Sequence, residues 1–312
     1  MEPPAHPYLL LNPTYQTKFY FADFPIERSG YTLKNNLKKY YGVFALPTTI
    51  VFTIVFLIPF VLGIYLSFCD FTTVSDSIFT GLSNYKKVFT DLNFQNALWF
   101  TVKFTVVSVI SINIIAFSLA LLLTNKIKGR SFFRTVFFMP NLIGGIVLGY
   151  IWQLIINGVL SYLGVTITYD PTYGFWGLVI LTNWQMIGYM MIIYIAGIGN
   201  IPKDLIDAAK VDGANSFDIL RHVTIPMVMP SVTICLFLTI TNSFKLFDAN
   251  LALTDGAPSR QTAMVALDIY KTFYGAVGSQ GIGQAKAVIF FLLLALVSLI
   301  QLKITRKREV EA

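Results

Sequence analysis

Six long apolar blocks, separated by shorter polar segments, dominate the chain. They run over residues 42–68, 97–124, 133–157, 175–198, 227–250 and 281–303. An α-helix rises about 1.5 Å per residue, so about 20 apolar residues cross the roughly 30 Å hydrocarbon core of a bilayer. The blocks lack the alternation of barrel strands, and a backbone in lipid must satisfy its own hydrogen bonds. The pattern predicts an all-α integral membrane protein with six transmembrane helices.

The composition supports this prediction and excludes a nucleic-acid partner. Of the 312 residues, 55% are apolar and 12% are charged, against about 25% charged in an ordinary soluble domain. Charge is sparse in the apolar blocks and concentrated between them, because an ionised side chain in hydrocarbon costs several kcal/mol. The net charge of +7 comes from Lys and Arg beside those blocks. A nucleic-acid-binding protein would gather them on a soluble basic face instead.

The distribution of basic residues predicts the orientation. Sixteen of the 23 Lys and Arg residues lie on one side: five before the first block, four from the end of the second block to the start of the third, three after the fourth, and four from the last residue of the sixth onward. Cytoplasmic loops carry the excess of Lys and Arg, so both termini are expected in the cytoplasm. We predict a cytoplasmic extension at 1–37, a six-helix domain at 38–307 and a short cytoplasmic tail at 308–312. The sequence shows no cleavable signal peptide, so we expect the first apolar block to direct membrane insertion and to stay in the protein.

Motifs for catalysis or metal binding are missing from the sequence. Cys69 and Cys235 have no zinc-site or disulfide-framework spacing, and His6 and His222 are far apart. The sequence contains no G-x-x-x-x-G-K-[ST] phosphate loop, no G-x-S-x-G nucleophile motif and no H-E-x-x-H zinc motif. We therefore expect no enzyme activity, no metal and no ATP site on this chain.

The segment at 199–226, predicted to be cytoplasmic, has the pattern of a short helix. Pro202 suits a first helical turn. Asp204 and Asp207 follow near the helix start, where the dipole favours negative charge. Gly213 fits the position after the helix end. On these features alone, an ordinary amphipathic loop and a docking loop are both open.

A second short helix is expected in the same segment. It runs from Ser216 to Arg221, with Ser216 as its N-cap. Pro226 then marks the start of the fifth span. The segment 199–226 is therefore predicted to be a compact helix–turn–helix, which we call the coupling loop for the reason given next.

The coupling loop resembles the EAA signature of permeases from binding-protein-dependent ABC importers. The resemblance rests on Asp207-Ala208-Ala209, on Gly213 after three further residues, and on Val223-x-Ile225-Pro226. The family has Glu in place of Asp207, Ile in place of Val223 and Leu in place of Ile225. In this family the loop forms a coupling helix that docks on a cytoplasmic ATPase. The contact residues that the resemblance implies are Asp207, Ala208, Ala209, Asp212, Gly213, Arg221 and Pro226, with His222 beside them.

Three further segments are similar to the carbohydrate-type members of that family, and the similarity covers about residues 38–307. They are Leu251–Pro258, Asn141 after Phe138-Met139-Pro140, and Leu46-Pro47 through Pro59. The resemblance implies the type I ABC importer permease fold in the bacterial cytoplasmic (inner) membrane. It also implies four kinds of partner: the lipid bilayer, a second homologous permease subunit, two copies of an ABC ATPase that bind ATP and Mg, and an extracellular solute-binding protein.

Polar residues inside the fourth and fifth spans are candidates for a substrate path, because polar groups in a membrane are usually functional. Hydroxyl and amide groups beside aromatic rings suit a sugar, whereas the alternative role is hydrogen bonding between helices. Helical spacing places Thr239, Asn242 and Ser243 near one face, and it allows Lys245 and Asp248 to pair. The predicted path comprises Thr182, Asn183, Gln185, Tyr189, Thr239, Asn242, Ser243, Lys245, Leu246 and Asp248.

Alignment with maltose-type permeases through the coupling motif, without gaps, places family sugar-contact positions on Tyr189, Thr239, Ser243 and Leu246. Leu246 replaces a polar contact, which indicates a different sugar. For Asn113, Gln153 and Asn157, bonding between helices is the favoured role.

Two other functional classes agree less well with the sequence than an ABC importer permease does. An ion-coupled secondary transporter is the alternative, but no clear internal repeat is present and such a carrier would not need the patterned loop. An intramembrane enzyme lacks its motifs. A phosphate-bearing substrate such as glycerol phosphate would favour several cations in the cavity, and Lys245 is the one strong candidate. A neutral mono- or oligosaccharide is therefore the favoured substrate.

Overall fold

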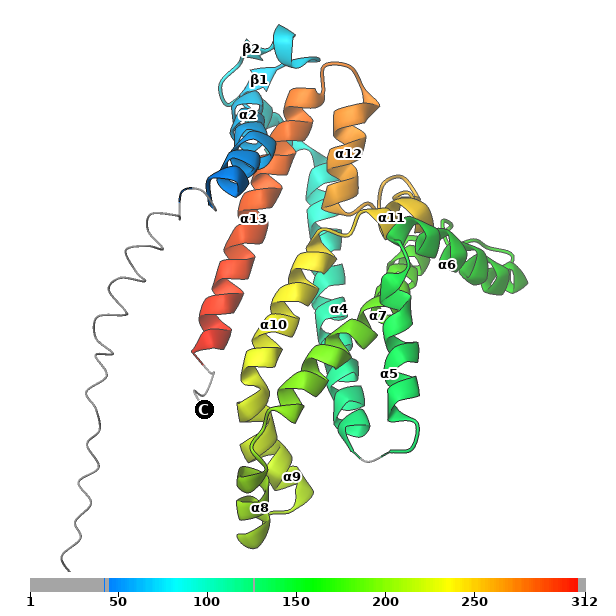
Figure 1. Cartoon of the computed structure of the whole chain (residues 1–312). Coiled ribbons are helices and arrows are strands. Elements are labelled where there is room, and N and C mark those ends of the chain that lie inside the picture. Colours follow the sequence, from blue (N-terminus) through cyan, green and yellow to red (C-terminus); the bar gives the residue numbers. More distant parts are fainter. Residues whose placement is uncertain (1–41, 43–44, 126, 308–312) are drawn as a thin grey trace, which may run out of the picture. The chain divides into compact units, whose positions relative to one another are not determined.

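The computed structural model describes residues 42, 45–125 and 127–307 (Figure 1). The predicted extension at 1–37 and tail at 308–312 lie outside these residues. The chain divides into two units, Met1–Phe60 and Val61–Ala312, which are described separately.

The first unit contributes a helical segment that starts at Ala45 and contains the π-helical turn η1 (Thr53–Leu57). The wide turn comes just before Pro59, which has no amide hydrogen to donate and whose ring would crowd the carbonyl of residue 55. Phe52 and Phe56 stack with their ring centroids 5.1 Å apart. The apolar side chains of this segment are largely exposed, as expected for a surface in contact with lipid.

The second unit is built from helices and one very short hairpin, which Figure 1 colours by their position along the sequence. In the hairpin, β1 (Cys69–Asp70) pairs antiparallel with β2 (Ile78–Phe79), with Cys69 opposite Phe79. The helices are α2 (Ile58–Leu66, which begins in the first unit), α3 (Ser83–Thr90), α4 (Leu92–Thr124), α5 (Arg130–Phe138), α6 (Gly145–Leu160), α7 (Pro171–Gly199), α8 (Lys203–Val211), α9 (Ser216–Ile219), α10 (Ile225–Phe244), α11 (Asp248–Leu253), α12 (Val265–Gly275) and α13 (Gln280–Arg306). The short turns are η2 (Val74–Asp76), η3 (Met139–Leu142), η4 (Ser161–Leu163) and the π turn η5 (Leu220–Thr224).

The prediction of an all-α protein with six membrane spans is confirmed within the described residues. Six helical segments have the length and apolar composition to cross a bilayer: Ala45–Leu66, Leu92–Thr124, Gly145–Leu163, Pro171–Gly199, Ser216–Phe244 and Gln280–Arg306. The chain is therefore a multi-pass membrane protein.

The third span differs from the predicted continuous helix at 133–157. The helix stops at Phe138, passes through η3 and resumes as α6 at Gly145. Pro140 cannot donate a backbone hydrogen bond, and Gly144, with an extended backbone, is the N-cap of the new helix. The prediction used hydrophobicity alone, which is continuous across this break.

The fifth span also differs from the predicted helix at 227–250. α10 ends at Phe244, and α11 begins as a separate helix at Asp248. At its other end, α10 is continuous with α9 through the π turn η5. The predicted second loop helix is therefore the first part of the fifth span, and Pro226 lies in the first turn of α10 instead of marking a boundary.

Two buried apolar clusters lie along the helix bundle. α4 and α7 pack extensively against each other, and α10 packs on both. One cluster, toward the start of α7, contains Phe100, Phe104, Leu178, Leu181 and Leu253. The other, toward the end of α7, contains Ile112, Met186, Met190, Tyr194, Val228 and Cys235.

A buried ion cluster joins α4, α12 and α13. Lys286 Nζ lies 2.7 Å from Asp268 Oδ2 and 2.6 Å from Asp91 Oδ2, and it donates a 2.8 Å hydrogen bond to Thr272 Oγ1. Arg260 Nη1 lies 3.7 Å from the other oxygen of Asp268. Partial burial would raise the pKa of the Asp91 carboxyl, but the hydrogen bond and positive charge of Lys286 hold this pKa below its usual range.

Candidate substrate cavity and coupling loop

A polar cavity of about 490 Å³ lies where α7, α10, α11 and the start of α6 meet. We call it the central cavity. Along α7 it falls between Leu181, in one apolar cluster, and Met190, in the other. Its size is in the range of small-molecule sites. The lining residues are Asn141, Gly145, Thr182, Gln185, Met186, Asn242, Lys245, Leu246, Phe247, Asp248 and Ala249.

The break between α10 and α11 shapes one wall of this cavity. α11 can reach the cavity because α6 offers glycines where the two helices touch. A Cβ added at Gly145 would lie 2.8 Å from Asp248 Cβ, and one added at Gly149 would lie 2.6 Å from Ala252 Cβ. Both distances are shorter than real Cβ contacts, so only glycine permits this approach. The close packing places Asp248 at the cavity wall.

Several polar groups on the wall keep hydrogen-bonding capacity. The Thr182 hydroxyl is buried and has no hydrogen-bond partner among the described residues. Gln185 donates from Nε2 to the Ile143 carbonyl at 3.2 Å. The side chains of Lys245 and Asp248 are exposed. The cavity therefore presents hydroxyl, amide and charged groups together.

The structure brings six of the ten predicted path residues to the central cavity. They are Thr182, Gln185, Asn242, Lys245, Leu246 and Asp248. Their contact with a substrate stays a prediction.

Four predicted path residues do not line the central cavity. Asn183 is buried and donates to the Val179 carbonyl of its own helix at 2.8 Å. Ser243 is fully buried, with no hydrogen-bond partner among the described residues. Tyr189 is half-buried, with its ring centroid 6.5 Å from that of Phe138.

The fourth of these residues, Thr239, belongs to a hydrogen-bond network between helices. Its hydroxyl donates to the Cys235 carbonyl at 2.8 Å and accepts from Asn113 Nδ2 at 3.1 Å. The Tyr194 hydroxyl donates to Asn113 Oδ1 at 2.7 Å. The network joins α4, α7 and α10, so Thr239 and Asn113 connect helices in this structure.

The predicted pairing of Lys245 with Asp248 is wrong. The ion pairs formed by the described residues do not include this one. The prediction assumed a continuous helix, in which residues three apart lie on one face. Lys245 is instead the C-cap of α10, and Asp248 starts α11.

Sequence reasoning did not assign a site role to Asn141, Gly145, Met186, Phe247 and Ala249, which also line the cavity. Asn141 directly follows Pro140, and this proline was the available signal for a helix break that exposes nearby polar groups.

The coupling loop forms two helices joined by a left-handed glycine. α8 covers Lys203–Val211, and Gly213 has φ of +83°, a value that favours glycine. The predicted N-cap Ser216 is wrong, because Asn215 fills this position. Its side chain accepts from the backbone amides of Phe217 and Asp218, and the Asp218 carboxylate accepts from the backbone amide of Asn215. This reciprocal pair is a capping box.

Most residues predicted to contact an ATPase are accessible. Asp207, Ala208, Asp212, Gly213 and Arg221 are exposed, whereas Ala209 and Pro226 are half-buried. Lys210 Nζ lies 3.0 Å from Asp207 Oδ1, and both side chains are more than half exposed, so this pair contributes little stability.

Apolar side chains are exposed on the same loop. Leu205 is 43% exposed, Phe217 65% and Val211 87%. The loop therefore offers small, apolar and acidic groups together on its accessible surface.

The central cavity and the coupling loop share the same two helices. α7 carries Thr182 and Gln185 and ends at Gly199, where the coupling loop begins. α10 returns from the loop to Asn242. Ile206 and Val223 of the loop pack on the apolar cluster near the end of α7. A displacement of the loop would therefore act on the helices that line the cavity.

Comparison with known proteins identifies the family of this bundle. A family profile described as "Binding-protein-dependent transport system inner membrane component" matches residues 112–310, which include the coupling loop and the central cavity. The chain belongs to this family. It is a membrane permease of the ABC importer class.

Individual relatives cover most of the permease. A probable permease of a starch degradation product transport system from Thermoanaerobacterium thermosulfurigenes is 49% identical, over 87% of this chain and 96% of the relative. A trehalose/maltose transport permease from Thermococcus litoralis is 31% identical, over 77% and 84%. A multiple sugar-binding transport permease from Streptococcus mutans is 29% identical, over 89% and 100%.

Solved structures share the fold. The permease superimposes with a TM-score of 0.75 on a chain of a bacterial ABC transporter that imports the acidic polysaccharide alginate. The identity is 20%, and the match covers 88% of this chain and 99% of the other. The fold is therefore that of type I ABC importer permeases.

Proposed function

We propose that this permease translocates a carbohydrate through the central cavity and is driven by partner ATPases that dock on the coupling loop. The observation that carries the proposal is the physical link between the two sites. Thr182 and Gln185 line the cavity on α7, Asn242 lines it on α10, and the loop connects these two helices. Movement imposed on α8 would thus change the cavity walls.

A sugar suits the chemistry of the cavity. Sugars carry hydroxyl groups that both donate and accept, and the wall offers the Thr182 hydroxyl and the Gln185 and Asn242 amides. Phe247 provides an aromatic face for the apolar side of a pyranose ring. The sugar-transport relatives, among them the starch product permease at 49% identity, add support.

A neutral sugar fits the charges of the cavity better than an anionic one. Lys245 supplies one positive charge, and Asp248, on the same wall, supplies one negative charge. A phosphate-bearing substrate would favour a net positive site. The proposed substrate is therefore a neutral mono- or oligosaccharide, delivered by an extracellular solute-binding protein.

The energy source is proposed to lie on other subunits. The sequence has no phosphate loop, so two copies of a cytoplasmic ABC ATPase would bind ATP and Mg. A second homologous permease would complete the path, since one chain supplies six spans. Both chain termini and the coupling loop would face the cytoplasm of a bacterial cell, in agreement with the excess of Lys and Arg on that side.

A pair of substitutions at Gly213 tests the coupling role. Gly213→Trp places a large side chain in the proposed docking surface. ATP-driven uptake should then fall at least tenfold. The purified ATPase subunits should keep their basal rate of ATP hydrolysis. Gly213→Asn is the matched control, because asparagine tolerates a left-handed backbone better than other non-glycine residues. Normal uptake and normal stimulated hydrolysis in Gly213→Trp would refute the proposed role.

A further inference from the structure

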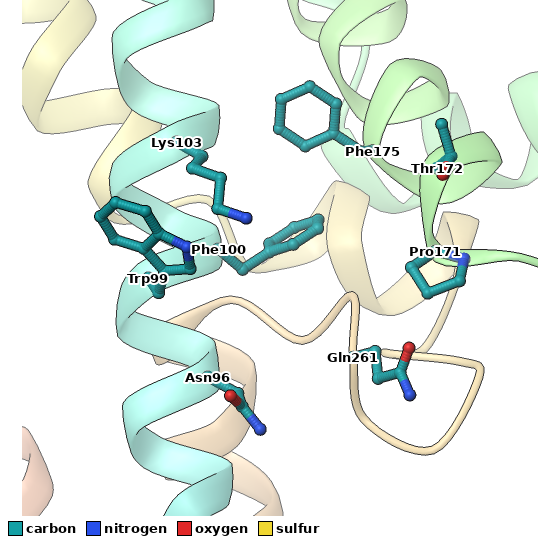
Figure 2. Close-up of a pocket in the computed structure, with 8 residues that line it drawn as sticks. All are labelled: Asn96, Trp99, Phe100, Lys103, Pro171, Thr172, Phe175 and Gln261. Carbon is teal, nitrogen blue, oxygen red and sulfur yellow. The ribbon is translucent and has the colours of Figure 1, made fainter.

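A second cavity, of about 540 Å³, lies at the end of the bundle where α4 and α7 begin. Figure 2 shows that its side chains come from the first turns of α4, from the start of α7 and from the loop that carries Gln261. We call it the end cavity. α7 has 29 residues, about 43 Å of helix. The end cavity is thus separated by nearly the whole of α7 from the coupling loop.

The end cavity combines aromatic rings, amides and one cation. Trp99, Phe100 and Phe175 supply the rings, and Phe100 meets Phe175 edge to face with centroids 5.7 Å apart. Lys103 Nζ lies 5.2 Å from the centroid of the Trp99 ring. In Figure 2 the lysine side chain extends into the space beside these rings, and Gln261 lies at the margin.

Lys103 has no carboxylate partner in the described part of the chain. It nevertheless belongs to α4, a helix of 33 residues that is otherwise mostly apolar. A cation placed in a spanning helix without a counter-ion is a candidate for a functional group. Its ammonium group can donate up to three hydrogen bonds, and the amides of Asn96 and Gln261 add donors and acceptors nearby.

The rigid supports of the end cavity indicate a preformed site. The Thr101 hydroxyl accepts from the Val265 amide at 3.0 Å, which fixes the loop after Gln261 to α4. On the other side, a Cβ added at Gly174 would lie 2.8 Å from Thr262 Cγ2, so α7 packs closely on the same loop. The walls are therefore held by the fold itself.

We propose that the end cavity is a second saccharide subsite, which holds one sugar unit of an oligosaccharide while another unit occupies the central cavity. Both cavities are lined by α7, and Thr172 is ten residues from Thr182, which corresponds to about 15 Å along the helix. A sugar ring would pack on the aromatic rings, and its hydroxyls would bond to Lys103, Asn96 and Gln261. This inference rests on the proposed function, because it requires carbohydrate transport.

The subsite should act on chain length, and transport by the complete reconstituted complex tests this. Uptake is measured for saccharides of one to six units made of glucose, xylose or arabinose, and the series that the wild type transports is used. Trp99→Ala and Lys103→Gln should lower the uptake rate of the longest member about fivefold to tenfold relative to the shortest, as expected when an aromatic or charged contact in a pocket is lost.

Trp176→Ala is the matched control. Trp176 lies on the first turns of α7 and is 51% exposed, but it does not line the end cavity. If Trp99 only anchors its helix at the membrane interface, Trp99→Ala and Trp176→Ala should have the same effect on the dependence of uptake on chain length. Equal length dependence in Trp99→Ala, Trp176→Ala and the wild type would overturn the subsite.

The outcomes separate the subsite from the proposed function. Sugar uptake by the wild type with an unchanged ratio of long to short substrates in Trp99→Ala and Lys103→Gln overturns the subsite alone. Uptake confined to monosaccharides also overturns it. Absence of any saccharide uptake by the wild-type complex overturns the proposed function and the subsite with it.

Discussion

Lys286 and Asp268 form an ion pair of 2.7 Å in which neither side chain is exposed. Lys286 is in α13 and Asp268 in α12, and Asp91 at the start of α4 approaches the same ammonium group to 2.6 Å. Three segments are therefore joined at one buried charge. A buried pair is weak evidence of net stabilisation, but loss of one partner leaves an uncompensated charge.

Replacing Lys286 by methionine should destabilise the protein strongly. Among the residues that the structure describes, the buried Asp268 would keep Arg260, at 3.7 Å, as its one remaining ion-pair partner. Breaking a buried ion pair in this way costs about 3–5 kcal/mol. The melting temperature of the purified protein in detergent checks this, and Lys286→Met with Asp268→Leu is the control. The double variant should melt at a higher temperature than Lys286→Met; if both melt like the wild type, the pair has no structural role.

The pH dependence of stability should include a contribution from Asp91. Lys286 lowers the pKa of this carboxyl in the folded state, so the carboxylate form favours folding. This contribution is complete above the unfolded pKa of about 4 and is lost as the pH falls through the lower folded pKa. Melting temperatures of the wild type and Asp91→Asn should differ at pH 6 and converge as the pH falls to the lowest values. A difference that stays constant over the whole range would contradict this assignment.

Position 208 tests whether the exposed surface of α8 is a docking surface. Ala208 is exposed in this chain, so a larger side chain should leave its fold unchanged. Ala208→Trp should reduce recovery of the ATPase with the permease in a pull-down by about tenfold or more, whereas Ala208→Ser should behave as the wild type. Equal recovery of the ATPase with both variants would show that α8 does not dock there.

Two polar residues of α10 should respond differently to substitution. Asn242→Leu removes an amide from the central cavity, and uptake should fall about tenfold, as expected for one lost hydrogen bond to substrate. Thr239→Val removes a bond to Asn113 between helices, so it should cost about 1 kcal/mol of stability and leave the sugar preference unchanged. Uptake with each variant, at matched protein levels, checks the contrast. A changed sugar preference in Thr239→Val would contradict this and would indicate that Thr239 contacts the substrate.

The membrane spans could be predicted because burial in lipid imposes a simple rule on local sequence. Every predicted apolar block overlaps a helix long enough to cross the bilayer. The two breaks, near Pro140 and after Phe244, were missed for a related reason. Hydrophobicity continues across the first break, and the second lies in a block that is apolar overall although it contains Lys245 and Asp248. The positions of both breaks depend on backbone chemistry and on packing between α6 and α11.

The two short helices of the coupling loop could also be predicted from local sequence, because the residues that start and end a helix act within a few positions. The site depends more on long-range contacts. Thr239 bonds to a residue 126 positions away, and no local pattern distinguishes this bond from a contact with substrate. The carboxylate partners of Lys286 likewise come from two segments distant in sequence. The sequence therefore shows a lysine in an apolar block but does not predict the ion pairs that it forms.

The most direct test of the central claim is sugar uptake into vesicles by the complete purified complex, with ionophores that collapse the proton and sodium gradients. The account predicts that uptake continues with these ionophores, requires ATP on the side of the coupling loop and requires the solute-binding protein on the other side. Uptake that stops when the ion gradients collapse, and that does not depend on ATP, would contradict the account and identify an ion-coupled carrier.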